Sequence, residues 1–516
     1  MIENNVKIGL RLTKKDVFLL ISVITTGLLV RFYYFPYDIP ITLDAFSYFL
    51  YAMDTMVSGQ LPTKYTMPNN GWPLFLSIFF SIFRFENFLD YVTLQRVLTV
   101  IFSVLTAIPT YLLCKKFFNQ NLAFLGALLV VLTPRIVQNS LGGTTDPFYI
   151  FLTTTAVFLF LSKKKIWIYT SFFILALSSL VRYEGLLLLI PFSILFIVRF
   201  KAESKIVLRY LMVLGIFTIT LLPVAYLRIE ATGQDGLLSH VFGGARVAVT
   251  EGSFLKESDT KFVFQDGIFG LIKYVSVVLF PLFFIFIPYG LYIFFKKRGY
   301  EINSLIFIAI FMLIPGFYAY GRGIQEPRYV LVVLPIASVI SLYTIEKFLS
   351  KTSLTKFILI LMLVFIVSSS LAYLEFKKTD YSHEREAVQL SLIIQTLKGG
   401  INEFSPESTY VHTATFHDVK MPLLTSAIDF EPKIIALDGQ TVEEGIMNGR
   451  KDGLSYLIVD NLNTKQNRKP FLNDVFYQEE NYPYLIKIFD SKEHGYNYQV
   501  KIFKIDYDKF DSIIQR

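Results

Sequence analysis

Cysteine is nearly absent from this chain of 516 residues, in which Cys114 is the single copy. One cysteine excludes an intrachain disulfide, and it also excludes a metal cage built from several thiolates of this chain. The apolar run after the basic N-terminus lacks the small-residue cleavage site of a signal peptide, and it is long enough to span a membrane. We therefore expect this run to remain in the protein as its first membrane helix.

Charged residues are also scarce. They make up 17% of the chain, whereas 53% of the residues are hydrophobic and 16% are aromatic, and the mean hydropathy is +0.50. That composition excludes an ordinary soluble domain and is typical of a polytopic membrane protein. The net charge of +8 arises from short Lys and Arg clusters between apolar runs, which is the pattern of membrane insertion. We therefore expect membrane lipids around the chain and no nucleic acid as a partner.

Long apolar runs fill residues 1–375. Because a membrane span needs roughly 20 mostly apolar residues, these runs predict a polytopic α-helical membrane protein with about 11 transmembrane helices. The apolar run 71–83 is too short to span, and it predicts an interfacial or re-entrant helix within a first external loop, 36–91. The predicted spans are 16–35, 92–113, 122–138, 147–162, 166–181, 184–199, 206–227, 269–295, 303–320, 328–347 and 356–375.

Basic clusters predict the orientation of these spans. They follow alternate spans, on the side of the basic N-terminus, and the positive-inside rule makes this side cytoplasmic. An odd number of spans then places residues 376–516 outside the cytoplasm. A chain rich in Lys, Ile and Phe, without external cysteine, suits a prokaryotic plasma membrane. The clusters are Lys115 and Lys116; Lys163 to Lys165; Arg199, Lys201 and Lys205; Lys296, Lys297 and Arg298; and Lys347 and Lys351.

The composition changes in residues 376–516, where a helical run is followed by strand-like alternating runs. This order predicts a small extracytoplasmic α/β domain that ends in a hairpin. No Gly-rich phosphate loop opens a helix there, so we expect no nucleotide in this domain. The helical run is 383–399, and the strand-like runs are 408–414, 432–439, 454–461, 484–491 and 496–505.

Several charged residues fall at the predicted outer ends of the spans. Each has an ordinary explanation by itself: a charged side chain at a helix end can extend to the interface, and Asp146, which precedes Pro147, can cap the fourth span. Together, carboxylates at early helix mouths and arginines at later ones make a site that can bind a phosphate and activate a hydroxyl. The residues are Asp44, Asp146, Arg182, Glu184, Arg322, Glu326 and Arg328.

Four short motifs occur in order along the chain: ITLDAF after the first span, TTDPF in the second external loop, VRYEG at a later helix start and EPRYVLVVLP at the entry to a late span. As an ordered set over about residues 10–350, they resemble the GT-C membrane glycosyltransferases. These include protein O-mannosyltransferases, lipid A aminoarabinose transferases and the catalytic subunits of oligosaccharyltransferases. The resemblance implies the GT-C fold for the membrane region.

The resemblance also implies a function. A GT-C enzyme moves a sugar from a polyprenyl-phosphate donor to an acceptor hydroxyl on the outer face of the membrane. Asp44 is then the general base, and Asp146 positions the acceptor. Arg328 is the first candidate to hold the lipid phosphate. The further phosphate candidates are Arg322 and Arg182, and the supporting residues are Tyr48, Glu184 and Glu326.

Two departures leave the branch of this superfamily unassigned. The Trp-Trp-Asp-Tyr-Gly signature of oligosaccharyltransferase subunits is absent, because Trp72 and Trp167 are the only tryptophans and are not adjacent. Asp44 is followed by Ala45, where protein O-mannosyltransferases have a second acid. The acceptor stays open between a protein, a lipid and a glycan. The cofactor stays open: there is none, or, if the chain is oligosaccharyltransferase-like, there is a divalent metal that Asp146 helps to bind.

Two other classes of protein remain open. A transporter or flippase of lipid-linked sugars predicts paired half-repeats and polar residues near the membrane centre, whereas the polar residues here gather on one face. An assembly or anchor protein for residues 376–516 predicts no dependence on Asp44.

The long segment 228–259 has two readings as well. It is either a lid over the donor or acceptor or an ordinary external connection. Tyr48, one helical turn beyond Asp44, either faces the site or is a plain interfacial aromatic. His240 is a lone histidine, which argues against a metal site in that segment.

Overall fold

The computed structural model describes residues 12–39, 41, 43–63, 69–85, 88–254, 260–351, 353–402, 434–435, 437–460, 471–497 and 499–514. The chain divides into two compact units. One comprises residues 1–35, 44–83 and 94–378, and we call it the helical unit. The other comprises residues 36–43, 84–93 and 379–516, and we call it the C-terminal unit.

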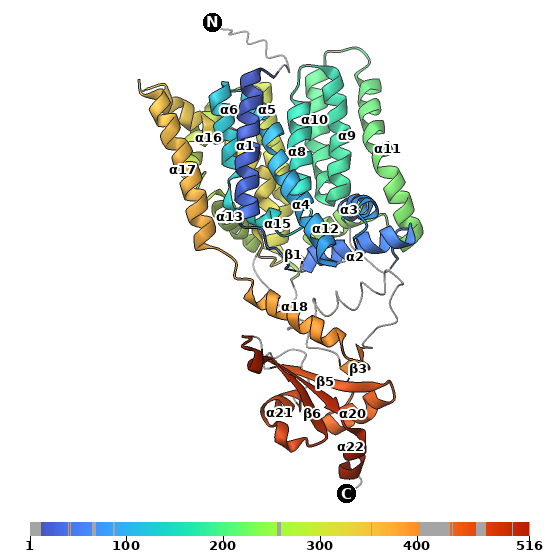
Figure 1. The fold of residues 1–516 in the computed structure, drawn as a ribbon. Helices are drawn as coiled ribbons and strands as arrows, with labels where there is room; N and C mark the ends of the chain where they lie inside the picture. The colour runs from blue at the N-terminus through green and yellow to red at the C-terminus, as the bar shows by residue number, and fades with distance from the viewer. Residues whose placement is uncertain are drawn as a thin grey trace. The chain divides into compact units, whose positions relative to one another are not determined.

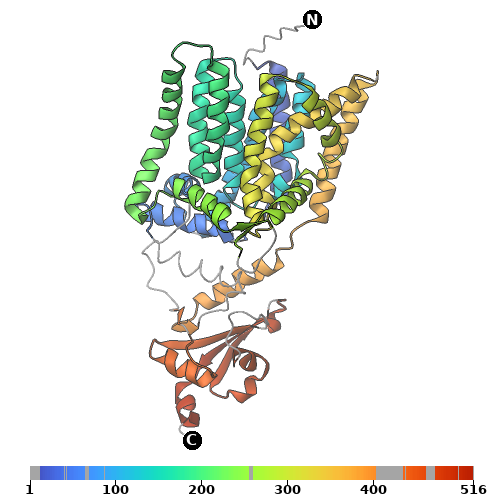
Figure 2. The same cartoon turned by 180° about the vertical axis from the view of Figure 1, so that it is seen from behind.

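The membrane region is built from helices that mostly run along one direction (Figures 1 and 2). They are α1 (Lys14–Tyr33), α2 (Leu43–Ser58), α3 (Gly71–Ile82), α4 (Phe88–Leu105), α5 (Ala107–Lys115), α6 (Gln120–Val131), α7 (Pro134–Ser140), α8 (Asp146–Phe160), α9 (Lys165–Val181), α10 (Leu189–Phe200), α11 (Ile206–Thr232), α12 (Leu238–Thr250), α13 (Phe264–Leu279), α14 (Ile287–Lys296), α15 (Tyr300–Gly321), α16 (Leu334–Leu349) and α17 (Thr355–Phe376). Two 3-10 helices, η1 (Tyr183–Leu188) and η2 (Pro327–Val333), lead into α10 and α16. Strands β1 (Gly252–Ser253) and β2 (Phe262–Val263) form a short parallel pair.

The polytopic α-helical fold class is confirmed. Among the described residues, seven helical segments are long and apolar enough to cross a membrane, and the bent pair α6 and α7 makes an eighth if it is one span. The predicted spans 147–162 and 166–181 correspond to the shorter apolar helices α8 and α9. The prediction of one helix over 269–295 is wrong, because α13 ends before Pro281, which has no N–H to donate, and the chain resumes as α14. The total of eleven spans stays a prediction.

A proline also explains the bend within the predicted span 122–138. Helices α6 and α7 meet at 54°. Pro134 is the first residue of α7, and a residue that precedes proline is disfavoured in the helical conformation. Thr133 accordingly leaves the helix, and the last carbonyl groups of α6 lose their partners in the next turn.

Arg31 supplies one of the missing donors at this bend. Its side chain is fully buried, and its Nη2 donates a hydrogen bond of 3.0 Å to the carbonyl of Val131, the last residue of α6. The same guanidinium donates to the hydroxyls of Ser103 and Ser140 at 2.7 and 3.0 Å. Arg31 therefore ties α1 to α4, α6 and α7. Arg31 was not among the predicted site residues.

Three helices lie across one end of this bundle, at the end where α1 finishes and α8 begins (Figure 1). They are α2, α3 and α12. The apolar run 71–83 forms α3, as a short helix, whereas α2 was not predicted, because its residues were assigned to a loop. Gly71 at the start of α3 approaches α9 closely, since a Cβ atom there would lie 2.6 Å from the backbone carbon of Leu180. Only glycine fits this contact without displacing backbone.

The C-terminal unit contains a five-stranded sheet in the order β4-β3-β5-β7-β6. The strands are β3 (Gly400–Asn402), β4 (Ile434–Ile435), β5 (Leu454–Asp460), β6 (Leu485–Asp490) and β7 (Val500–Ile505). Its helices are α18 (Ser382–Gln395), α20 (Val442–Arg450), α21 (Phe471–Tyr477) and α22 (Tyr507–Ile514), with 3-10 turns η3 (Glu479–Asn481) and η4 (Ser491–His494). Strands β3, β4 and β5 are parallel, and β7 runs antiparallel to both of its neighbours.

Both faces of this sheet are covered, because successive side chains of a strand point to opposite faces. Leu457 of β5 packs in a core with Ile446 of α20 and Val475 of α21. Its neighbour Ile458 packs in a second core with Leu390 of α18. The predicted α/β class and terminal hairpin, formed by β6 and β7, are therefore confirmed, while the predicted strand 408–414 lies outside the described residues.

Candidate active site

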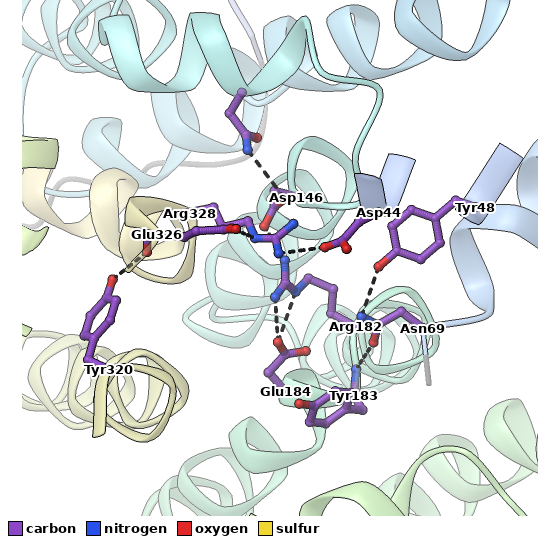
Figure 3. A network of polar contacts seen from close by, with 11 residues as sticks. Asp44, Tyr48, Asn69, Asp146, Arg182, Tyr183, Glu184, Tyr320, Glu326 and Arg328 are labelled. Carbon is purple, nitrogen blue, oxygen red and sulfur yellow. Dashed lines mark hydrogen bonds and ion pairs between the residues drawn. The ribbon is translucent and has the colours of Figure 1, made fainter. Parts of the chain in front are cut away.

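Charged residues from four separate segments meet at the end of the bundle covered by α2 and α12. Asp44 comes from the first turn of α2 and Asp146 from the start of α8. Arg182 and Glu184 stand where α9 passes into η1, and Glu326 and Arg328 stand at the start of η2. Figure 3 shows both guanidinium groups pointing into the same space, with the carboxylates around them. We call these six residues the charged network.

Arg182 lies at the buried centre of the network. Its Nη1 is paired with Asp146 Oδ1, and its Nη2 lies 2.6 Å from Glu184 Oε1. The side chains of Arg182 and Asp146 are only 7% and 4% exposed. Although burial alone would lower it, the adjacent Asp146 and Glu184 carboxylates hold the pKa of Arg182 well above its ordinary value. Arg182 is therefore a permanently charged and firmly held cation.

The local backbone explains this position. Arg182 is extended, with φ of −142° and ψ of 123°, between the last turn of α9 and the first turn of η1. The chain therefore turns its side chain away from both helices and toward α8. The guanidinium carbon lies 5.4 Å from the ring centre of Tyr329 and 5.9 Å from that of Tyr149, within the range of cation–π attraction.

Asp146 does not cap its helix, so the capping interpretation is wrong. The N-cap of α8 is Thr145, which makes no capping hydrogen bond through its side chain, and Pro147 stands in the first turn. The Asp146 carboxylate is turned toward Arg182 instead, and Asn139 Nδ2 lies 3.5 Å from its other oxygen. A first turn with proline needs fewer capping acceptors, because proline has no N–H.

Arg328 forms the exposed half of the network. Its Nη2 lies 2.6 Å from Asp44 Oδ2, and its Nε lies 2.5 Å from Glu326 Oε2. Here the side chains are more open: Arg328 is 20% exposed and Asp44 50%. An ion pair in such a setting is worth about 0–1 kcal/mol, whereas removal of one partner from a buried pair costs about 3–5 kcal/mol. The Arg328 pairs are therefore exchangeable, and the Arg182 pairs are not.

Asn69 connects Tyr48 to the backbone of η1, between Arg182 and Glu184 of the network. Asn69 Nδ2 donates to the Tyr48 hydroxyl at 3.4 Å, and the backbone N–H of Tyr183 donates to Asn69 Oδ1 at 3.1 Å. Tyr48 is buried, and burial raises its pKa. It faces the site, so the plain interfacial reading is wrong. Asn69 was not predicted, because nothing in its loop sequence marks it.

Arg322 stands apart from the charged network. It is exposed, and its Nη1 donates to the hydroxyl of Tyr318 at 3.1 Å. Among the predicted site residues, the structure thus brings together Asp44, Tyr48, Asp146, Arg182, Glu184, Glu326 and Arg328, but not Arg322 (Figure 3). It adds Tyr329, which was not predicted. The sequence could have indicated Tyr329, because the Arg-Tyr pair at 182–183 recurs at 328–329, and each pair stands at a 3-10 helix.

Two cavities adjoin at this site. The first lies among the charged residues Asp146, Arg182, Glu184 and Arg328 and measures about 10 Å³, which is room for about one water molecule. The second measures about 280 Å³ and is walled by α12, α15 and β2. Glu184 and Tyr329 line both. The segment 228–259 therefore contributes a wall, through α12, to a cavity beside the network.

The residues of the network do not fit a divalent metal ion. In the part of the chain that the structure describes, no three His, Cys, Asp or Glu side chains are grouped so that they could share an ion. Each carboxylate of the network is instead paired with a guanidinium group.

Comparisons with known proteins agree with this fold. Residues 71–227 match the family model described as dolichyl-phosphate-mannose-protein mannosyltransferase. This segment carries Asp146, Arg182 and Glu184. No curated protein sequence matches the chain.

Solved structures match over most of the chain. ArnT from Cupriavidus metallidurans bound to undecaprenyl phosphate has a TM-score of 0.59 at 10% identity, over 95% of this chain and 97% of that one. The Archaeoglobus fulgidus oligosaccharyltransferase in complex with Zn and sulfate has a TM-score of 0.56 at 12% identity, over 86% of this chain and 68% of that one. The archaeal oligosaccharyltransferase AglB from the same organism, in complex with an inhibitory peptide and a dolichol-phosphate, has a TM-score of 0.53 at 12% identity, over 87% and 70%.

The fold is thus that of the GT-C membrane proteins. The matched segment 71–227 adds a second likeness, to a mannosyltransferase family model, and both likenesses agree with the GT-C resemblance of the ordered motifs.

Proposed function

We propose that this protein transfers a sugar from a polyprenyl-phosphate donor to an acceptor hydroxyl at the extracytoplasmic face of the membrane. The observation that carries the proposal is the contact between Asp44 Oδ2 and Arg328 Nη2, at 2.6 Å. It joins a carboxylate that can accept a proton and a guanidinium that can bind a phosphate, and Arg328 also lines the smaller of the two cavities. A hydroxyl and a phosphate ester held there are the two reactants of glycosyl transfer.

Arg328 is the anchor for the donor phosphate. A guanidinium presents a planar fork of donors that matches two phosphate oxygens. Arg328 is the more exposed of the two arginines in the network, and its present carboxylate partners are exposed as well, so a phosphate can displace them. Arg182 cannot be released in this way, and Arg322 faces elsewhere. Arg182 serves as a fixed positive charge beside the anchor.

Asp44 is the general base. In the reaction it takes the proton from the acceptor hydroxyl as the hydroxyl oxygen attacks the anomeric carbon of the donor. The bond between that carbon and the phosphate oxygen breaks, and the electron pair leaves with the phosphate. Negative charge therefore grows on the phosphate in the transition state, where Arg328 and Arg182 stabilise it more than in the ground state.

Asp146 acts on this reaction in two ways. Its carboxylate holds Arg182 in place, and Asn139 Nδ2 lies 3.5 Å from its second oxygen. Asp146 also lines the smaller of the two cavities. We propose that its second oxygen also helps to orient the acceptor. Glu184 holds the other side of Arg182, and Glu326 holds Arg328 in the absence of donor.

The solved structures support a lipid phosphate as the part of the donor that the site binds. One is of ArnT bound to undecaprenyl phosphate, and another is of AglB in complex with a dolichol-phosphate. The basic clusters support the extracytoplasmic side as the place of the reaction, because they lie at the other ends of the helices from Asp44 and Asp146. A prokaryotic plasma membrane is the setting that we propose, with a protein, lipid or glycan acceptor.

A transfer assay tests this function. Purified protein in proteoliposomes receives radiolabelled polyprenyl-phosphate sugars and a cell-envelope extract as the source of acceptors, and both the transferred label and the released polyprenyl phosphate are measured. We expect transfer by the wild type and a loss with Asp44→Asn. Undiminished transfer by Asp44→Asn would overturn the mechanism. Movement of the lipid-linked sugar across the membrane without transfer would instead identify a flippase.

A further inference from the structure

The larger cavity beside the charged network has an uneven lining. Most of its surface is apolar and much of it aromatic, yet two of the residues that line it each have a buried polar atom without a hydrogen-bond partner among the described residues: Glu184 Oε2 and His240 Nε2. The aromatic residues that line it are Tyr183, Phe262, Phe264, Phe317, Tyr318 and Tyr329.

Of the two carboxylate oxygens of Glu184, one has a hydrogen-bond partner among the described residues and the other has none. Its Oε1 accepts hydrogen bonds from Arg182 at 2.6 and 3.3 Å, which fixes the carboxylate plane. Its Oε2 is buried with no partner, and the side chain is only 7% exposed. A buried carboxylate oxygen left without a donor costs free energy, so its position is explained best by a ligand that donates to it.

His240 reaches the same cavity from α12. Its ring stacks on Tyr183, with 5.5 Å between ring centres and 29° between the planes, and Tyr183 is the neighbour of Glu184 in η1. Burial, together with the nearby Arg228, lowers the pKa of His240, so the ring is neutral at neutral pH. A neutral imidazole nitrogen can donate or accept one hydrogen bond, according to its tautomer.

The chemistry of the lining decides between two occupants. A hydrocarbon chain would fit the aromatic walls but would leave Glu184 Oε2 and His240 Nε2 facing a group that cannot bond to them. A sugar ring presents C–H groups on its faces, which pack on aromatic rings, and hydroxyls at its edge. The volume of about 280 Å³ lies just under the range of about 300–1,000 Å³ typical of small-molecule sites.

We infer that this cavity binds the glycosyl group of the donor, with Glu184 Oε2 accepting a hydrogen bond from one sugar hydroxyl and His240 Nε2 bonding to a second. The inference rests on the proposed function. It makes Glu184 and His240 the residues that select which sugar is transferred, and it makes α12 a part of the specificity site.

Binding of two lipids tests the inference. Undecaprenyl phosphate and a panel of undecaprenyl-phosphate hexoses are titrated into the full chain in lipid nanodiscs. We expect the wild type to bind at least one hexose ester more tightly than the bare lipid. His240→Leu should lower the affinity for that ester about tenfold and change the affinity for the bare lipid by less than twofold, because it removes a hydrogen bond to the sugar alone. Glu184→Gln should change the order of preference among the hexoses.

A cavity-filling variant gives the control for a lipid occupant. Ala245→Phe narrows the same cavity from α12 and leaves every polar side chain of the lining unchanged in sequence. If the cavity holds the glycosyl group, this variant lowers the affinity for the hexose ester and leaves the affinity for the bare lipid unchanged. If Ala245→Phe weakens the binding of both lipids, or if His240→Leu changes the binding of neither, the cavity holds hydrocarbon and the inference is wrong.

Two further outcomes separate the sources of failure. If His240→Leu raises the KM for acceptor and leaves donor binding unchanged, the cavity belongs to the acceptor and the inference is wrong. If the wild type binds neither lipid, the proposed function itself fails.

Discussion

Asp44 and Arg328 neutralise each other across 2.6 Å. The charged network around them holds two more carboxylates than guanidinium groups, and the cavity among its residues has room for about one water molecule. A donor phosphate would add negative charge to a site that has no spare positive charge and no space. It must therefore take the place of a carboxylate on Arg328, and the displacement of Asp44 would free that carboxylate to act as a base.

This competition predicts opposite effects of Asp44→Asn on binding and on chemistry. Without the carboxylate, Arg328 is more available, and we expect undecaprenyl phosphate to bind about two- to fivefold more tightly, since an exposed ion pair is worth up to about 1 kcal/mol. The transfer rate kcat should fall by about 10²–10⁴, the usual loss with a general base. Asp54→Asn, in the same helix α2, is the matched control and should change neither quantity. Weaker lipid binding by Asp44→Asn would contradict the competition.

Arg328→Ala should remove the phosphate anchor. We expect kcat/KM for the donor to fall by about 10²–10³, because the guanidinium stabilises the leaving phosphate. Arg322→Ala removes an exposed arginine a few residues away, and it should stay within about twofold of the wild type. The comparison uses initial rates over a range of donor concentrations. If kcat/KM falls equally in both variants, Arg328 is not the specific binding residue for the phosphate.

Arg182→Ala should destabilise the fold more than Asp146→Asn. The alanine variant leaves two buried carboxylates without a cation, at a cost of about 3–5 kcal/mol, whereas the asparagine variant leaves Arg182 paired with Glu184 and costs about 1–3 kcal/mol. Thermal midpoints in detergent measure the order. An unchanged midpoint for Arg182→Ala would contradict the buried pairing.

Gly71→Ala should disturb the site without touching it. Its new Cβ would lie 2.6 Å from the backbone carbon of Leu180, two residues before Arg182, so either α3 or the end of α9 must shift. We expect at least a tenfold loss of transfer, because small misplacements of positioning groups have large effects on rate. Gly215→Ala, in α11, has open space around it and is the control. Retained activity of Gly71→Ala would show that this contact can relax.

The sequence was sufficient to predict what depends on local pattern. Apolar length predicted the helical fold class, and alternation predicted the α/β unit with its closing hairpin. Residues such as Asp44 and Asp146 stood out because a charge beside an apolar run is costly without a purpose. Their order along the chain also carried the resemblance to GT-C enzymes.

What the sequence did not reveal depends on contacts between distant segments. The pairing of Asp146 with Arg182 rather than with its own helix end needs α8 and α9 side by side. Arg31 stands near the end of a predicted span, and nothing in the local sequence shows that it bonds the freed carbonyl of Val131 at the α6–α7 bend. The cavity walled by α12 arises from segments far apart in sequence, and no single motif marks it.

The two arginines of the network both stand at 3-10 helices, but they differ in how freely they can move with them. Arg328 stands in the seven-residue 3-10 helix η2, which rises ~2.0 Å per residue, whereas an α-helix rises ~1.5 Å. Rewinding η2 as α-helix would shorten it by ~3.5 Å and draw Arg328 toward α16 with no break in the chain. Arg182 directly precedes the 3-10 helix η1, but its two buried carboxylate partners hold it in place. Of the two cations of the network, Arg328 is thus the one that can follow a rewinding of its 3-10 helix.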